Sequence, residues 1–160
     1  MKSLVFFSAI IFISFHSFSQ TISKGLPNED KFTEIGFVKQ MGTGKIMTLS
    51  KPNDVDLFIL SYQDAQYTQI TDMKVIALGT KEVTNNIKKA IVDLANDKEG
   101  KTITVELPEG RGVIIFSKIK ALGVVNIKGY VTDNNGIKSE TPFLTLKTIE
   151  TLFPTSHFGQ

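Results

Sequence analysis

The 160-residue sequence contains no cysteine. A chain without thiols forms no disulfide, has no cysteine nucleophile and offers no thiolate ligand to a metal. Small exported domains are often cross-linked by disulfides. If this chain is exported, its fold has to be stabilised by an apolar core and by backbone hydrogen bonds alone.

Histidine and arginine are almost as scarce. The two histidines, His16 and His157, lie near opposite ends of the chain, and Arg111 is its single arginine. This composition does not predict a Ser-His-Asp triad, a Cys-His pair or a zinc site with several histidines. Arginine is the preferred side chain for forked recognition of phosphate, so a dedicated phosphate site is not expected either. We expect no metal and no cofactor.

The chain also lacks an excess of charge of either sign. The chain carries 18 basic and 16 acidic residues, a formal net charge of +2. Proteins that bind nucleic acid or anionic membranes generally carry a marked excess of basic residues. The near balance therefore gives no reason to expect either of these partners.

The N-terminus has an apolar run that is short for a membrane span. Leu4–Ile13 is interrupted only by a serine, whereas a spanning helix needs about 20 apolar residues. Lys2 before this run and the small residues Ser17 and Ser19 after it are typical of a secretory signal peptide. We predict cleavage after Ser19, so residues 1–19 would be removed and the mature chain would be periplasmic or secreted, without a stable membrane span. The alternatives are an uncleaved anchor or an interior strand.

Hydrophobic periodicity predicts one α+β domain over residues 32–154, preceded by a flexible lead-in over 20–31 and followed by a tail over 155–160. We expect a mostly antiparallel sheet of about eight strands, one amphipathic helix over about 81–97 and a short helix over about 146–153. The expected strands cover 35–41, 45–51, 55–62, 73–78, 102–107, 113–120 and 124–132, and an eighth begins at 137.

The long helix is predicted from its cap and its apolar stripe. Thr80 is a good N-cap residue, and Glu82 suits the positive end of the helix dipole. The stripe recurs at intervals of three, four and seven residues, and consists of Val83, Ile87, Ala90, Ile91 and Leu94. This helix is expected to lie on the sheet.

Glycine and aromatic residues predict three turns. Residues 42–44, Gly-Thr-Gly, and the pair Asn135-Gly136 each favour a hairpin because glycine readily adopts a positive φ. Residues 63–66 are predicted to form another turn, which would place Tyr62 opposite Tyr67 as a cross-strand aromatic pair.

Two segments resemble ligand-binding loops without fitting them. The segment MGTGKIM lacks the glycine five residues before its Gly-Lys pair and the hydroxyl residue after it, both of which a phosphate loop requires. The segment VTDNNGIKSE has the composition of a calcium loop, but its acidic residues do not fall at the ligand positions. Both are interpreted as turns.

Carboxylates are the remaining acid–base groups. Four loop aspartates, Asp54, Asp56, Asp64 and Asp72, are better explained as solvated turn residues than as a cation site. A glycoside hydrolase needs two carboxyl groups about 5–9.5 Å apart across a cleft. The candidates are Glu106, Glu109 and Glu140, and nothing in their spacing requires them to meet.

The most specific site hypothesis comes from the hairpin around residues 121–123, Ala-Leu-Gly. A three-residue loop there pairs residue 118 with 126 and residue 116 with 128, leaving Val113, Ile115 and Ile119 in the core. The outer face would then carry Phe116 beside a strip that can bind sugars or acidic peptides through stacking and charge. The strip consists of Lys118, Lys120, Asn126, Lys128 and Tyr130.

These observations favour an exported, non-catalytic binding module of the cell envelope that contacts a protein or a glycan through a sheet face or a loop edge. The alternative is a small carboxylate-dependent hydrolase acting on envelope glycan, which would need a deep cleft with two converging acids. A partner-dependent envelope component, the third possibility, would leave a contiguous apolar patch exposed.

Overall fold

The computed structural model describes residues 31–40, 42, 44–67, 72–121 and 123–159. The predicted leader and most of the predicted lead-in lie outside the described residues. The elements in chain order are β1 (Phe32–Gln40), β2 (Gly44–Pro52), β3 (Phe58–Gln63), β4 (Met73–Gly79), α1 (Lys81–Asn96), β5 (Thr102–Glu106), the 3₁₀ turn η2 (Pro108–Gly110), β6 (Gly112–Ala121), β7 (Val124–Asp133), β8 (Lys138–Glu140), α2 (Leu146–Leu152) and α3 (Thr155–Phe158).

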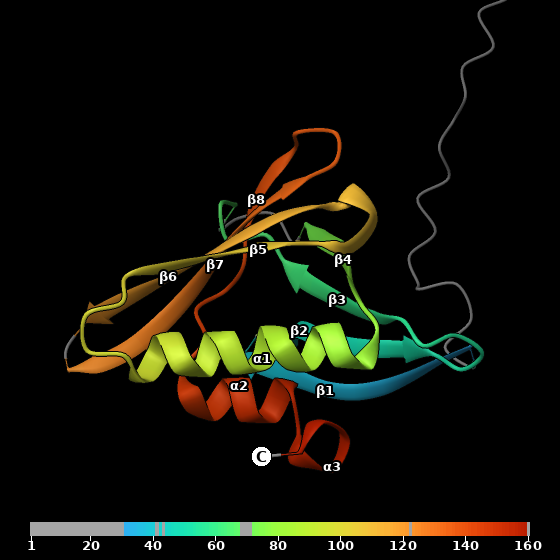
Figure 1. Cartoon of the computed structure of the whole chain (residues 1–160), viewed down its shortest axis with the longest axis horizontal. Coiled ribbons are helices and arrows are strands. Elements are labelled where there is room, and N and C mark those ends of the chain that lie inside the picture. Colours follow the sequence, from blue (N-terminus) through green and yellow to red (C-terminus); the bar gives the residue numbers. More distant parts are fainter. Residues whose placement is uncertain (1–30, 41, 43, 68–71, 122, 160) are drawn as a thin grey trace, which may run out of the picture.

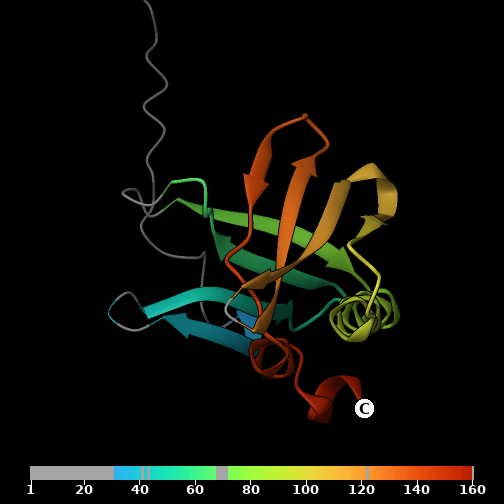
Figure 2. The same ribbon diagram turned by 90° about the vertical axis from the view of Figure 1, so that its left-hand side faces the viewer.

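The expected α+β architecture is confirmed, with eight strands that pair antiparallel throughout. The strands form two four-stranded sheets, ordered β1-β2-β3-β4 and β5-β6-β7-β8. Each sheet is a simple meander, and α1 connects the first to the second. The strands of the two sheets cross at a steep angle. Figure 2 shows this, with β1–β4 running across the view and β5–β8 running up it. The sequence did not predict this division into two sheets.

One apolar core fills the space between the sheets and the helices. α1 runs across the front of the molecule beneath β5–β7, with α2 below it beside β1 (Figure 1). The largest fully buried side chains come from both sheets, from α1, and from α2 and the residues beside it. They include Met47, Leu49, Tyr62, Leu78, Ile91, Ile114, Ile127, Leu144, Ile149, Leu152 and Phe153.

The predicted cap of α1 is confirmed. The Thr80 side chain accepts a hydrogen bond from the backbone N–H of Val83 at 3.4 Å, and the helix ends at Asn96, close to the predicted residue 97. Ile87, Ile91 and Leu94 are buried, as the apolar stripe predicts. Among the described residues, no helix is long and apolar enough to cross a membrane.

The C-terminal segment is more ordered than expected. α2 begins with a capping box in which Thr145 and Thr148 exchange side-chain and backbone hydrogen bonds. Its last carbonyls approach Gly36 of β1 so closely that an added Cβ would lie 2.3 Å from the Leu152 oxygen. The segment predicted as a tail contains α3, because Phe158 is buried against Phe58 with ring centroids 5.2 Å apart.

The predicted register of the β6–β7 hairpin is wrong by one residue. Ala121 pairs with Val124, so a two-residue connection replaces the expected three-residue loop. As a result Phe116, expected on the outer face, is 3% exposed and packs in the core, whereas Ile115, expected in the core, is 41% exposed. Gly129 stands opposite Phe116, and a Cβ there would lie 3.2 Å from the ring. The missing side chain leaves room for the ring of Phe116.

The predicted Tyr62–Tyr67 pair is also wrong. Tyr62 lies opposite Lys74 on β4, and Tyr67 falls in the connection after β3, where it is 50% exposed. β3 spans Phe58–Gln63 instead of the predicted 55–62, so Gln63 belongs to the strand and not to the turn, and because β4 does not begin until Met73 the connection is longer than the predicted four-residue turn. The positive φ predicted for the glycine turns is confirmed at Gly42, Gly44 and Gly136.

Candidate functional site

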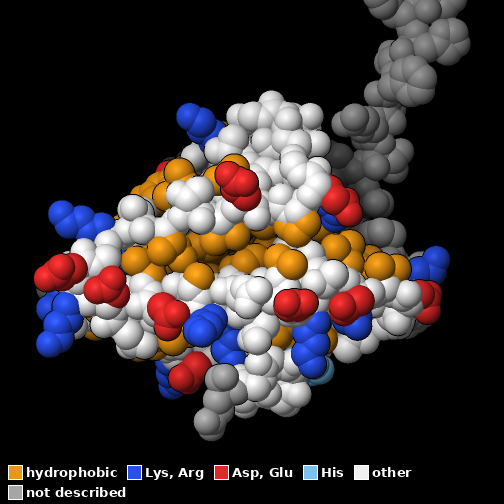
Figure 3. Space-filling view, in the orientation of Figure 1, with side chains coloured by type: hydrophobic (Ala, Val, Ile, Leu, Met, Phe, Trp, Pro, Cys, Tyr) orange, Lys and Arg blue, Asp and Glu red, His pale blue; other side chains and the backbone are white. Residues whose placement is uncertain are grey.

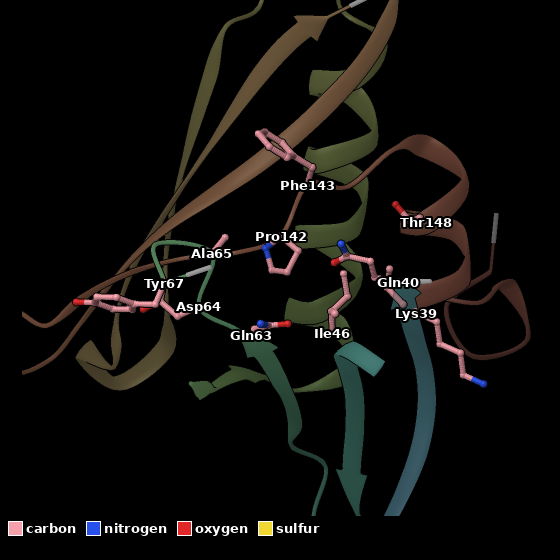
Figure 4. A pocket seen from close by; sticks show the side chains of 11 residues that line it. Lys39, Gln40, Ile46, Gln63, Asp64, Ala65, Tyr67, Pro142, Phe143 and Thr148 are labelled. Atoms are coloured by element: carbon pink, nitrogen blue, oxygen red, sulfur yellow. The ribbon is translucent and has the colours of Figure 1, made fainter. Parts of the chain in front are cut away.

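An open cleft of about 530 Å³ lies where the β1–β2 hairpin, the end of β3 and the segment from β8 to α2 meet. Its lining is mostly apolar or aromatic, with amide and hydroxyl groups between (Figure 4). The residues are Val38, Lys39, Gln40, Ile46, Gln63, Asp64, Ala65, Tyr67, Pro142, Phe143 and Thr148. The cleft is therefore assembled from segments that lie far apart in the sequence.

Asp64 is a buried residue of the cleft wall. It is 1% exposed, and its Oδ1 accepts hydrogen bonds from the backbone N–H groups of Gln66 at 3.1 Å and Glu140 at 3.0 Å. Next to it, the backbone N–H of Ala65 donates to the Glu140 carbonyl at 2.8 Å. These bonds join the end of β3 to the edge of β8. They tie the two sheets together at the cleft.

The second Asp64 oxygen, Oδ2, is buried and has no hydrogen-bond partner within the described part of the chain. A buried polar atom of this kind is uncommon in folded proteins. In Figure 4 Ile46 and Gln63 project into the cleft. Asp64 therefore shapes the wall of the cleft rather than presenting an open charge to it.

Tyr62 makes a second tie between the sheets. Its hydroxyl lies 2.6 Å from the Ser139 Oγ on β8, and both residues are buried. Burial raises the pKa of the Tyr62 hydroxyl above its usual value near 10, and the nearby carboxylate of Asp64 adds to the rise, while the Ser139 hydrogen bond acts in the opposite direction.

This raised pKa predicts a loss of stability at alkaline pH. Above about pH 10 the unfolded chain releases the Tyr62 proton while the folded chain retains it, so the free energy of unfolding falls as the pH rises. Replacing Tyr62 by Phe removes this contribution and makes the fall less steep. Urea unfolding of both proteins at pH values from about 9 upward, a range that spans the ordinary tyrosine pKa, measures how the free energy of unfolding changes with pH. An equal dependence on pH in the two proteins would contradict the prediction.

Tyr67 and Phe143 line the cleft, and Tyr130 lies nearby on the outer face of the second sheet, beside Lys128. These three residues are called the aromatic rim. Phe143 is 54% exposed and lines the cleft. The Lys128 ammonium lies 5.2 Å from the centroid of the Phe143 ring and 5.7 Å from that of Tyr130, and it pairs with the Glu140 carboxylate. The rings thus flank a largely buried ion pair.

The five residues of the predicted strip lie on two different faces. Lys118 and Lys120 pair with Ile127 and Val125 on the side of the sheet that faces α1. The Lys118 ammonium donates to the Asp97 carbonyl at the C-terminal end of that helix, where a cation is favourable.

The other three residues of the strip, Asn126, Lys128 and Tyr130, lie together on the outer face. Of these, Lys128 adjoins the aromatic rim, because its ammonium lies over the rings of both Tyr130 and Phe143. The single strip disappears because the shift of register moves Lys118 and Lys120 to the opposite side of β6.

The candidate catalytic carboxylates are kept apart. Glu106 lies on β5 and Glu140 on β8, with β6 and β7 between them. Three strand spacings amount to about 14 Å, which exceeds the separation in glycoside hydrolases. Glu109 pairs with Arg111 through its side chain. No three His, Asp or Glu residues gather into a possible metal site within the described ranges.

Sequence reasoning missed the role of Phe143, and it treated Asp64 only as a loop aspartate. The local signal for Phe143 is an aromatic residue directly after Pro142, in a segment with no apolar period. That signal marks an irregular, exposed aromatic residue but says nothing of what lies beside it.

No protein-family model, curated protein or solved structure matches this chain, so an inference about its function depends on the cleft and the residues around it.

Proposed function

We propose that this protein is an exported, non-catalytic binding module of the cell envelope, and that its cleft holds an apolar segment of a partner protein. The observation that carries the proposal is an open, largely apolar cleft bordered by half-exposed aromatic rings. Half-exposed aromatic side chains beside a concave apolar surface are typical of sites where proteins anchor one another.

The charges around the cleft favour an apolar ligand. Of its charged lining residues, Asp64 is buried and Lys39 points away, with its ammonium 5.0 Å from the centroid of the Phe37 ring (Figure 4). Lys128 and Glu140 on the rim neutralise each other. A sugar would depend on the few amide and hydroxyl groups of the lining, whereas an apolar side chain can cover the apolar surface that makes up most of it.

The hydrolase alternative has less support. It requires two carboxyl groups across one cleft, and the strand order separates Glu106 from Glu140. Among the described residues that line the cleft, Asp64 is the only one with a carboxylate, so an acid–base pair has no second member in that part of the lining. Export to the envelope is supported by the predicted signal peptide over residues 1–19.

The test is binding to an array of short peptides and, in parallel, to an array of glycans. We expect peptides with a central Leu, Phe or Trp to bind, and Phe143→Ala to weaken that binding about tenfold, since interface aromatic residues contribute more than 1 kcal/mol. Fluorescence anisotropy with a labelled peptide from the array measures the change.

Ile137→Ala is the matched control, because Ile137 is 55% exposed but does not line the cleft. It is expected to bind the peptide as the wild type does. Binding to glycans alone would overturn the choice of a protein partner, and binding to neither array would overturn the proposed module.

A further inference from the structure

Within the described part of the chain, β5 forms an edge of the second sheet and pairs with no strand other than β6. The Lys101 carbonyl accepts from the Lys118 N–H at 2.8 Å, and the Leu107 N–H donates to the Gly112 carbonyl at 2.9 Å. At both ends of β5, therefore, the odd-numbered residues bond to β6. Because backbone groups alternate in direction along an antiparallel strand, the even-numbered residues direct their N–H and C=O groups away from β6. These residues are Thr102, Thr104 and Glu106.

The other outer strands carry the features that normally prevent edge pairing. β1 has two register shifts and is packed against α2. β8 has three residues, and its edge is bonded by Ala65. β4 has a register shift near its end and contains Lys74. β5, in contrast, pairs with β6 in unbroken register and contains neither proline nor lysine.

An apolar band runs beside this edge. Figure 3 shows hydrophobic side chains gathered along the length of α1, in the hollow between that helix and β5. The partly buried apolar residues of α1 and β5 that pack against the core are Val83, Val92, Ile103 and Val105. A strand added to β5 would direct alternate side chains over this band.

We propose that β5 pairs with β5 of a second copy of this chain, antiparallel and about a two-fold axis that passes between the two Thr104 residues. In this register Thr104 faces its own copy, Ile103 faces Val105 of the partner subunit, and Thr102 faces Glu106 of the partner subunit. Every outward backbone group of β5 then has a hydrogen-bond partner. The second sheets of the two subunits, β5-β6-β7-β8 in each, become one continuous eight-stranded sheet.

Self-complementarity identifies a second copy as the occupant. In the Thr104-centred register the apolar residues of the inner face meet each other, as do the two threonines of the outer face, and both kinds of cross-strand pair are favourable. The only charged residue of β5, Glu106, falls opposite a threonine, so no like charges face each other. An interface in which the same patch serves both subunits is the usual form of a dimer.

The test uses charge at position 104, where the two copies meet. Thr104→Lys and Thr104→Glu each place like charges opposite one another, so each variant alone is expected to be monomeric. Mixed in equal amounts, the two variants place Lys opposite Glu and are expected to dimerise. Analytical ultracentrifugation of the wild type, the variants and the mixture, up to about 0.1 mM protein, measures the association.

Val75→Lys is the matched control, because Val75 is an exposed residue of β4, the other strand that flanks α1. It is expected to remain dimeric, and circular dichroism checks that every variant is folded. A wild-type protein that is monomeric throughout the concentration range would overturn the proposal. So would a Thr104→Lys protein that still dimerises, or a mixture that stays monomeric.

Discussion

Replacing Phe116 by Ala is expected to lower the free energy of unfolding by about 3–5 kcal/mol, the usual loss for a large buried aromatic residue. Phe116 is 3% exposed, at the centre of β6. Its ring fills the space that Gly129 leaves on β7. Neither Gly129 nor the backbone of β7 can supply atoms to fill the cavity, so the loss is expected near the upper end of that range. Urea unfolding followed by circular dichroism measures it.

Ile115→Ala is the matched control, because Ile115 is the neighbour of Phe116 on the opposite face of β6 and is 41% exposed. Its truncation is expected to lower the free energy of unfolding by about 1 kcal/mol or less, since partial burial loses little apolar area. In the register predicted from the sequence the two residues exchange roles. A larger loss for Ile115→Ala than for Phe116→Ala would therefore contradict the β6–β7 pairing described here.

Sequence patterns predicted the elements of the fold better than the pairing between them. The alternation of Ile103, Val105 and Leu107 and the cap at Thr80 are local signals, and the strand and the helix that they predict are present. Register is not a local property when a strand is apolar on both faces. β6 is such a strand, since either Ile114 or Ile115 can be assigned to a core.

Gly129 of β7 fits the register that the structure shows. A register argument from apolar counts gives Gly129 no weight, because glycine has no side chain to bury. In the folded chain its lack of a Cβ allows Phe116 to pack across β7, where a Cβ would also lie 3.0 Å from Thr141. An aromatic residue opposite a glycine is thus the signal that the apolar pattern concealed.

The candidate site was less predictable than the fold. Its walls come from β1, β2, β3, the segment after β8 and α2, and no spacing in the sequence relates Ile46 or Gln63 to Phe143. Two members of the predicted strip, Lys128 and Tyr130, do contact each other, and the Lys128 ammonium also lies over the Phe143 ring. Lys128 and Tyr130 were singled out because they lie two residues apart on β7 and therefore share a face, which is a local feature of the sequence. Which residues lie beside them depends on how distant segments pack together.

Replacing Asp64 by Ala is expected to lower the free energy of unfolding by about 2–4 kcal/mol. The change removes two hydrogen bonds to a carboxylate oxygen and leaves the backbone N–H of Glu140 without a side-chain acceptor in a largely buried position. Because this N–H belongs to β8 and Asp64 follows β3, the loss falls on the connection between the two sheets. The β8 hairpin is expected to open first, which native-state hydrogen exchange detects as lost protection at Glu140.

Asp64→Asn separates the hydrogen-bonding geometry of the side chain from its charge. An Asn side chain keeps an oxygen where Oδ1 accepts both hydrogen bonds, and it places an amide where Oδ2 has no partner among the described residues. Its expected loss is about 1 kcal/mol, because a neutral acceptor replaces a charged one. Peptide binding in the cleft should follow the same order, weakest for Asp64→Ala. An Asn variant as unstable as the Ala variant would contradict the role of Oδ1 as the tie between the sheets, since both hydrogen bonds can survive in the first and neither in the second.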